Sequence, residues 1–148
     1  MSQLTLQELQ LLIIEWANNK ELVKKENAPK QRLKLLEEVG ETAKAILQNN
    51  QIEVKDGVGD IFVVLIILFA QLEIEVDFNI SDMLEETELE YYILFQHLTG
   101  LNVSFFSLGY LNDISKKSGL DLTECANIAW NEIKNRTGET INGTFIKD

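Results

Sequence analysis

Residues 55–70 read KDGVGDIFVVLIILFA and place two aspartates directly before an unbroken apolar run. The run from Ile61 to Ala70 is shorter than the roughly 20 apolar residues that a helix needs to cross a bilayer, and we expect it to fill a protein core. Asp56 and Asp60 lie about one helical turn apart on one face, and Asp60 cannot easily turn away from the apolar residues that follow. Because burying an unpaired carboxylate is costly, this helix predicts a compensating cation beside its aspartates.

A second acidic group lies upstream in LLEEVGE, residues 35–41. Glu37 and Glu38 stand four and three residues before Glu41, a spacing that lets the three carboxylates converge on one side of a helix. Two interpretations remain open for this group, a solvated helix edge and a cation site. The glutamates follow the edge of a predicted apolar face made by Leu35, Leu36, Val39, Ala43, Ile46 and Leu47.

Helix-start signals recur along the rest of the chain. Pro29 suits the first turn of a helix, where its missing N–H is not needed. Capping patterns, in which a side-chain oxygen precedes a glutamate by three residues, occur at Thr5 with Glu8, Asp82 with Glu85, and Asp121 with Glu124. With the apolar spacing, they predict helices at about 5–25, 29–47, 53–75, 83–98 and 122–136.

The remaining segments are shorter or less regular. Residues 101–118 also suit a helix, although Gly109 weakens that prediction. Asn142-Gly143 predicts a tight turn, followed by a short strand or an ordered arm. We therefore expect one all-α domain over residues 1–148, a bundle of antiparallel helices with a short C-terminal arm.

The composition limits the partners that such a bundle can have. With 24 Asp and Glu against 13 Lys and Arg, the net charge is −11, which argues against a general binder of nucleic acid or anionic membranes. An anionic ligand would need metal ions or a local basic cluster. The single cysteine, Cys125, excludes an intrachain disulfide and a zinc–thiolate cluster. No signal-peptide pattern opens the sequence, and we expect a cytoplasmic protein.

A short link between the helices at 29–47 and 53–75 makes them antiparallel neighbours and brings the two acidic groups face to face. Carboxylate oxygens without histidine or cysteine suit Mg²⁺ or Mn²⁺. A di-iron bundle would need Glu-x-x-His pairs, and the single histidine, His97, has no glutamate at position 94. The predicted metal ligands are Glu37, Glu38, Glu41, Asp56 and Asp60.

Three stretches together resemble the MazG-like nucleoside triphosphate pyrophosphatases: KQRLKLLEEVGE at 30–41, GDIFVVL at 59–65 and AWNEIKNRTGETINGTFIK at 129–147. Residues 78–118 carry no part of the resemblance. The family is all-α, and its motif EExxE followed by ExxD binds Mg²⁺. Glu37, Glu38, Glu41 and Asp60 match that motif, but Gly57 stands at the first position of ExxD. Asp56 could supply the missing oxygen.

The resemblance implies hydrolysis of a nucleoside triphosphate to the monophosphate and pyrophosphate by water attack on the α-phosphoryl group. Glu38 or Glu41 would accept the proton of the water. The nucleobase of the substrate could stack on Trp16, although a tryptophan at this position also suits the core. The further residues expected to contact the substrate are Gln31, Lys34, Asn131, Lys134, Arg136 and Lys147.

Members of the family assemble as homodimers or homotetramers, and a third helix as apolar as residues 53–75 favours such association. Two other interpretations remain open. One is a catalytically silent, acidic helical interaction protein of the same fold, in which the Gly57 departure has abolished metal binding. The other is an acidic phage DNA mimic, which only the net charge supports. Metal-dependent thermal stabilisation separates the enzyme from both.

Overall fold

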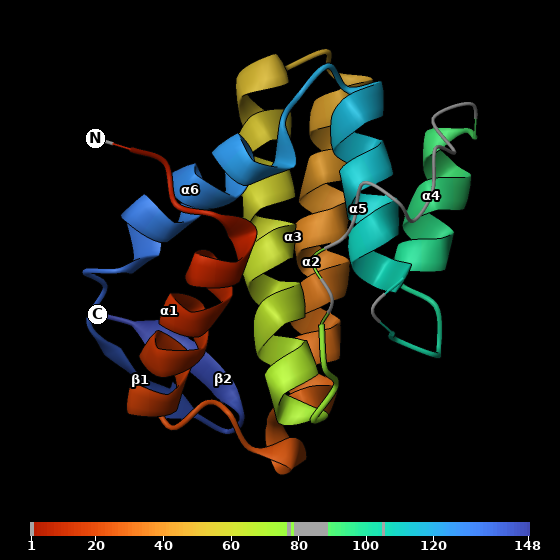
Figure 1. Ribbon diagram of the computed structural model, residues 1–148. Helices are drawn as coiled ribbons and strands as arrows, with labels where there is room; N and C mark the ends of the chain where they lie inside the picture. Colours follow the sequence, from red (N-terminus) through yellow and green to blue (C-terminus); the bar gives the residue numbers. More distant parts are fainter. Residues whose placement is uncertain (1, 77, 79–88, 105) are drawn as a thin grey trace.

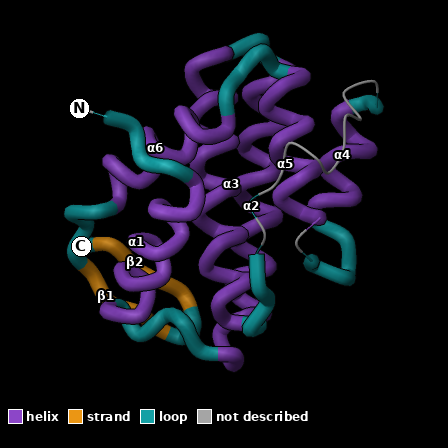
Figure 2. Tube along the Cα trace, viewed as in Figure 1, coloured by secondary structure: helices purple, strands orange, loops and turns teal. Residues whose placement is uncertain are grey.

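A computed structural model describes residues 2–76, 78, 89–104 and 106–148, and it confirms the all-α fold (Figure 2). A two-stranded antiparallel hairpin accompanies the helices. In chain order the elements are α1 (Leu6–Asn19), the 3₁₀ helix η1 (Lys25–Asn27), α2 (Ala28–Leu47), α3 (Gln51–Gln71), α4 (Tyr91–Leu98), α5 (Phe106–Lys117), α6 (Leu122–Ile133), β1 (Gly138–Ile141) and β2 (Thr144–Lys147).

Helix α3 forms the centre of the fold, with α1, α2, α5 and α6 packed around it (Figure 1). Its N-cap is Asn50, whose side chain accepts a 3.3 Å hydrogen bond from the N–H of Glu53. The apolar run is buried almost completely, with Ile61, Phe62 and Leu65 at 0% exposure. The apolarity that suggested association is therefore already satisfied inside one copy of the chain. Among the described residues, no helix is long and apolar enough to cross a membrane.

Helix α2 runs antiparallel to α3 after a short turn in which Asn49 has a positive φ of 52°. Its buried face matches the predicted apolar face only in part, since Leu35 is buried and Val39 and Ile46 pack against the core as expected. Leu36 and Leu47, expected in the core, are 53% and 83% exposed. The residues that face α3 are Ala28, Gln31, Leu35, Glu38, Thr42 and Ala45.

The contact between Thr42 and Gly57 explains this rotation of α2. A Cβ atom at Gly57 would lie 2.1 Å from the Thr42 Oγ1, which shows that the two helices approach closely there. The Thr42 hydroxyl is in turn fixed, because it donates a 2.8 Å hydrogen bond to the carbonyl of Glu38. This close approach turns Thr42 inward, and Glu38, one turn earlier, turns inward with it.

Helices α1 and α3 end earlier than the sequence predicts, and each ends in the same way. Helix α1 ends at Asn19 instead of about Lys25, and α3 ends at Gln71 instead of about Glu75. In both cases a glutamate with a φ of 57° follows and reverses the chain, at Glu21 and Glu73. The reversal is closed by hydrogen bonds from the N–H of Leu22 to Ala17 and of Ile74 to Phe69, an arrangement typical of helix C-termini.

Helix α6 crosses α3 at a second glycine. A Cβ atom at Gly59 would lie 2.3 Å from the carbonyl oxygen of Cys125 and 3.0 Å from the Cβ of Ala129. The predicted cap at Asp121 is confirmed, since its side chain accepts from the N–H of Glu124. The helix ends at Ile133, three residues before the predicted end at 136.

The predicted turn at Asn142-Gly143 is confirmed, and the segment around it is a β-hairpin. Both turn residues have positive φ values, 52° and 85°, as a type I′ turn requires. Thr140 ties the hairpin to the end of α1, because its hydroxyl donates a 2.7 Å hydrogen bond to the carbonyl of Lys20. The hairpin therefore has a fixed position beside α1.

Helices α4 and α5 pack against each other on the side of α3 that is away from α1 (Figure 1). The suggested helix at 101–118 is confirmed as α5, which buries Gly109. The helix predicted at 83–98 is described only from residue 89 onward, where α4 begins at Tyr91. Its expected start at Asp82 and Glu85 lies outside the described residues.

We predict that Gly57→Ala lowers the free energy of unfolding by about 1–3 kcal/mol, the range typical of overpacked cores. Rotation of Thr42 does not relieve the overlap, because its Cβ and Cγ2 would also lie only 3.0 and 3.1 Å from a methyl group at position 57. Denaturant unfolding would measure the loss. The double variant Gly57→Ala/Thr42→Ala should recover most of it, and a double variant as unstable as the single one would contradict this explanation.

Candidate active site

A pocket of about 490 Å³ opens between α2, α3 and the hairpin, close to the ends of α1 and α6. It gathers residues from all three stretches that suggested a site. The residues that line it are Trp16, Leu22, Gln31, Lys34, Glu37, Glu38, Glu41, Asp60, Val63, Val64, Ile67, Ile133, Arg136, Thr144, Phe145, Ile146 and Lys147.

One wall of the pocket is acidic. Glu37, Glu38 and Glu41 come from α2, and Asp60 comes from α3. Glu38 is the most buried of the glutamates at 8% exposure, because the rotation of α2 turns it toward α3. Its Oε2 atom is buried and has no hydrogen-bond partner among the described residues. A buried carboxylate oxygen without a partner is costly, and it marks a place where a cation or a donor would bind.

Lys34 provides the positive charge nearest to this wall. Its ammonium group donates to Glu37 and lies 3.2 Å from the Oε1 of Glu38. Burial alone would lower the pKa of Lys34, but the hydrogen bonds and charges of the two glutamates outweigh it and raise the pKa above the usual value. Lys34 therefore stays protonated and holds two of the three glutamates.

The pKa values of the acidic wall are shifted upward. Burial raises the pKa of Glu38, with Lys34 opposing the shift and Glu41 and Glu37 adding to it. Burial also raises the pKa of Asp60 to about 7, and the charge of Glu38 raises it further. Near neutral pH the wall therefore resists full ionisation unless positive charge arrives.

Further cations line the pocket together with the acidic wall. Arg136, just beyond α6, and Lys147 of β2 both line the pocket. The charge of Arg136 acts on Asp60 and lowers its pKa, although less than burial raises it. The pocket thus has carboxylates on one side and Lys34, Arg136 and Lys147 around its rim.

The far end of the pocket is apolar and aromatic. The rings of Trp16 and Phe145 meet edge to face, with centroids 4.9 Å apart and planes at 70°. Leu22, Val64 and Ile67 complete this end. The Nε1 atom of Trp16 is buried and has no acceptor in the described part of the chain. This end can take a flat apolar group that also offers a hydrogen-bond acceptor.

Gln31 lines the pocket but has a structural contact as well. Its side-chain Nε2 donates a 3.2 Å hydrogen bond to the carbonyl of Val64, which joins α2 to α3. The residue is 6% exposed. Its amide therefore helps to fix the two helices that carry the acidic wall.

Three residues expected at the site do not line the pocket. Asp56 is half-buried on α3, one turn before Asp60. Asn131 and Lys134 are exposed at the end of α6. Lys134 is the C-cap residue of that helix, and the chain turns after it to bring Arg136 to the pocket.

Glu132 and Phe145 lie in the stretch 129–147 that carries the family resemblance, but the sequence alone predicted no role for either residue. The charge of Glu132 raises the pKa of Asp60 more than that of Asp56 does, which places a fifth carboxylate near the acidic wall. Glu132 lies in the last turn of α6, and because the helix ends at Ile133, helical spacing to Arg136 gave no reliable signal for its place. The place of Phe145 at the pocket depends on the hairpin lying beside Trp16, a contact between residues far apart in sequence.

The structure also explains why Gly57 carries no carboxylate. The Thr42 side chain occupies the space that any side chain at position 57 would need. The first residue of ExxD therefore has no equivalent in this packing. Asp60 is the α3 carboxylate that lines the pocket.

The described residues contain no group of three or more histidine, cysteine, aspartate or glutamate side chains placed closely enough to hold a metal ion. Lys34 accounts for part of this arrangement, since it draws Glu37 and Glu38 toward its own ammonium group. The donor chemistry nevertheless fits Mg²⁺, because the wall offers hard carboxylate oxygens and an unpartnered Glu38 Oε2. Metal binding would require the glutamates to exchange Lys34 for the ion.

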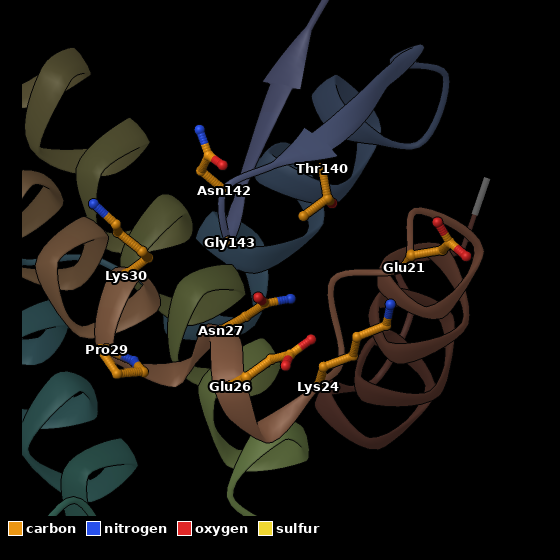
Figure 3. Close-up of a pocket in the computed structure, with 9 residues that line it drawn as sticks. All are labelled: Glu21, Lys24, Glu26, Asn27, Pro29, Lys30, Thr140, Asn142 and Gly143. Carbon is orange, nitrogen blue, oxygen red and sulfur yellow. The ribbon is translucent and has the colours of Figure 1, made fainter.

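A second pocket, of about 530 Å³, lies between the hairpin turn and the start of α2 (Figure 3). Glu21 and Glu26 balance Lys24 and Lys30 in its lining. Gly143 approaches α2 closely there, since a Cβ atom would lie 3.2 Å from the Asn27 Oδ1. None of the predicted site residues lines this pocket, and its balanced charges favour neither an anion nor a cation.

A comparison with known protein families matches the part of the chain that carries the acidic wall. Residues 28–88 match the MazG nucleotide pyrophosphohydrolase domain family, which confirms the resemblance over this region. A protein of Haemophilus phage HP1 (strain HP1c1), described as an uncharacterized 18.2 kDa protein in the rep-hol intergenic region, is 40% identical over 70 residues. The match covers 47% of this chain and 43% of that relative, so the chain spans less than half of its length. No solved structure matches the chain.

We predict that Asp60→Asn stabilises the metal-free protein at pH 8 but not at pH 4. The pKa of Asp60 is raised from 3.8 to about 7 in the folded protein, so the folded state holds a proton that the unfolded state has lost between these values. Its contribution to stability therefore falls as pH rises through that window. Removing the charge should raise the melting temperature at pH 8 by a few degrees, since 1 kcal/mol corresponds to about 2–4 °C in a domain somewhat larger than this one.

Thermal melts of both proteins from pH 4 to pH 8 in the presence of a chelator would measure this difference. Glu15→Gln, on the exposed side of α1, provides a control for the loss of one negative charge. Equal pH profiles for Asp60→Asn and wild type would show that Asp60 is not held in a costly ionised state.

Proposed function

We propose that the chain is a Mg²⁺-dependent nucleoside triphosphate pyrophosphohydrolase that converts a nucleoside or deoxynucleoside triphosphate to the monophosphate and pyrophosphate. The observation that carries the proposal is the composition of one pocket. The residues of the matched EExxE motif and Asp60 line it beside three cations and an aromatic end. Its volume of about 490 Å³ lies within the range usual for small-molecule sites.

Glu37, Glu38, Glu41 and Asp60 would hold the metal. Bound there, Mg²⁺ would supply charge neutralisation for the phosphates and a lower pKa for the attacking water. The high pKa of Asp60 and the unpartnered oxygen of Glu38 support this assignment, because both record negative charge that the described residues do not fully balance.

Glu38 is the better candidate for the group that accepts the proton of the water. Its Oε2 is unpartnered and its pKa is raised by burial, which brings it closer to the operating pH of a general base. Glu41 is exposed, and we propose that it contributes mainly charge. The water would be held at the unpartnered Oε2 atom of Glu38.

Lys34, Arg136 and Lys147 would contact the triphosphate. Arg136 suits phosphate best, because its guanidinium can donate two parallel hydrogen bonds to one phosphate group. Lys34 would leave Glu37 and Glu38 and donate to phosphate oxygens instead. The same lysine would thus neutralise part of the acidic wall before the substrate binds and would contact the substrate afterwards.

The aromatic end would take the nucleobase. Trp16 and Phe145 offer ring surface, and the buried Trp16 N–H offers one donor to a base acceptor. Trp16 also packs against the core, so substitution there would affect stability as well as binding.

One observation favours the second candidate, a silent relative of the same fold. Gly57 has no room for the first ligand of ExxD, and the carboxylates of the described residues do not converge on one point. In such a protein the acidic wall would bind neither Mg²⁺ nor a triphosphate. The two candidates differ in a measurement that needs no substrate, the shift in melting temperature when Mg²⁺ or Mn²⁺ is added.

We predict pyrophosphate release from at least one common triphosphate in the presence of Mg²⁺ or Mn²⁺. Glu38→Gln and Asp60→Asn should each lower kcat/KM by about a hundredfold or more, because each removes a negative charge from the proposed metal wall without changing its shape. Asp56→Asn should cost about tenfold, the scale of an indirect metal contact.

A pyrophosphate assay over the common ribo- and deoxyribonucleotides would test this, with Glu15→Gln as the charge control. A metal-dependent rise in melting temperature without pyrophosphate release would support the proposed metal site and contradict the proposed reaction. Near-wild-type turnover in Glu38→Gln or Asp60→Asn would reject the site.

We also predict that Arg136→Ala impairs turnover more than Lys134→Ala. Arg136 lines the pocket, whereas Lys134 caps α6 outside it. Loss of a charge-assisted hydrogen bond costs about 1.5–3 kcal/mol, which corresponds to roughly a 10- to 150-fold lower kcat/KM. Lys134→Ala is the matched control, since it removes one positive charge two residues away. Equal effects of the two changes would mean that only net charge matters.

A further inference from the structure

A lysine lies against the carboxylates to which the proposed function assigns a metal ion. The Lys34 ammonium group donates to Glu37 and lies 3.2 Å from the Oε1 of Glu38. Both glutamates follow Lys34 on α2, at spacings of three and four residues, so these contacts form within one helix. Lys34 therefore competes for two of the proposed metal ligands.

We propose that Lys34 couples the binding of the metal to the binding of a polyphosphate. The acidic wall then binds a divalent cation weakly when it is alone and more tightly when a triphosphate is present. The inference rests on the proposed function and adds a form of regulation to the same site. Such coupling is reciprocal, since by thermodynamic linkage each ligand changes the affinity for the other by the same factor.

The first argument is that the acidic wall is fixed, whereas the lysine is free to move. Gln31 donates a 3.2 Å hydrogen bond to the backbone of α3, and Thr42 packs closely against the same helix. These contacts lie on either side of Glu38 along α2, so they hold its carboxylate in the pocket. The Lys34 side chain is 42% exposed and has a flexible stem, which allows it to leave the glutamates.

The second argument is that Lys34 satisfies only part of the wall. It contacts the Oε1 atom of Glu38, whereas Oε2 is buried without a hydrogen-bond partner among the described residues. A second cation at Oε2 would share one carboxylate with the ammonium group. Like charges at such short range repel far more strongly in a partly buried site than in bulk water. The wall therefore favours either the lysine or a divalent cation, and not both together.

The third argument concerns the position of the lysine after its release. Lys34, Arg136 and Lys147 all line the pocket, so without an anion the released ammonium group would join two other cations. A polyphosphate supplies oxygens that accept charge-assisted hydrogen bonds from all three side chains. Release of Lys34 from the wall is thus unfavourable without a polyphosphate and favourable with one.

The experiment compares the wild type with Lys34→Met, which keeps an unbranched apolar side chain and removes its charge. Titration with Mn²⁺ alone, followed by the electron paramagnetic resonance signal of the free ion, measures metal binding without substrate. Lys34→Met should bind Mn²⁺ about 5- to 150-fold more tightly than the wild type, the range typical of coupled sites. In a second titration, with the complex of Mn²⁺ and inorganic triphosphate, this advantage should disappear or reverse.

Control variants separate this role from a general effect of charge. Lys30→Met removes the same charge one turn earlier on α2, at an exposed position outside this pocket. Arg136→Gln removes a cation of the same pocket whose charge acts on Asp60. Both should tighten the binding of Mn²⁺ alone clearly less than Lys34→Met does. Lys34→Arg keeps the charge and should bind Mn²⁺ as the wild type does. Circular dichroism spectra check that each variant is folded.

The possible results distinguish this proposal from the proposed function. Equal affinities of Lys34→Met and wild type for Mn²⁺, or an equal gain in Lys30→Met or Arg136→Gln, would overturn the coupling and leave the proposed metal site intact. An advantage of Lys34→Met that persists with the triphosphate complex would also overturn it, because Lys34 would then oppose the metal without any link to phosphate. Absence of Mn²⁺ binding in both proteins would reject the metal site together with the coupling.

Discussion

Carboxylates held against an apolar helix are the constraint on which the site depends. Glu38 and Asp60 face each other from α2 and α3, and burial raises the pKa of both. Ionisation there requires nearby positive charge, and Lys34 provides it from the same helix. Any other cation that binds the acidic wall therefore has to compete with Lys34 for its carboxylates. To hold Mg²⁺, Glu37 and Glu38 would have to release Lys34, and the released ammonium group would then be available to bind phosphate.

The rotation of α2 explains why Glu38 is buried in the acidic wall. The helix has two stripes at helical spacing, one with Leu35, Glu38 and Thr42 and one with the exposed leucines. Apolar spacing predicted one broad core face, which was correct for Leu35, Val39 and Ile46 and wrong for the exposed leucines Leu36 and Leu47. The fit of Thr42 against Gly57 selects the other stripe, and it is a contact between residues far apart in sequence. Hydrophobic pattern within one helix contains no information about such a contact.

Capped helix starts and the ends of α2 and α4 were predictable from sequence, whereas the ends of α1, α3 and α6 were not. Thr5 and Asp121 cap helices through bonds to residues three positions later, which local sequence specifies. The chain reversal after α1 is held in part by the carbonyl of Leu22, which accepts hydrogen bonds from the nearby Asn27 side chain and from Gln71, which is distant in sequence. The site shows the same division. The motif predicted the acidic wall, whereas the turn after α6 decided that Arg136 and not Lys134 lines the pocket, and the place of Phe145 depended on the folded hairpin.

The close packing of Gly57 on Thr42 also restricts the order in which substitutions can accumulate in this sequence. A glutamate at position 57, as in the ExxD pattern, meets the Thr42 side chain in the present packing. A smaller residue at position 42 would have to come first, and alanine, for example, would lose the hydroxyl bond to Glu38 together with a buried methyl group. The reverse order passes through a poorly packed intermediate. The ligand set of α3 is therefore subject to epistasis with α2, and descendants of this chain would retain the glycine for as long as they retain the threonine.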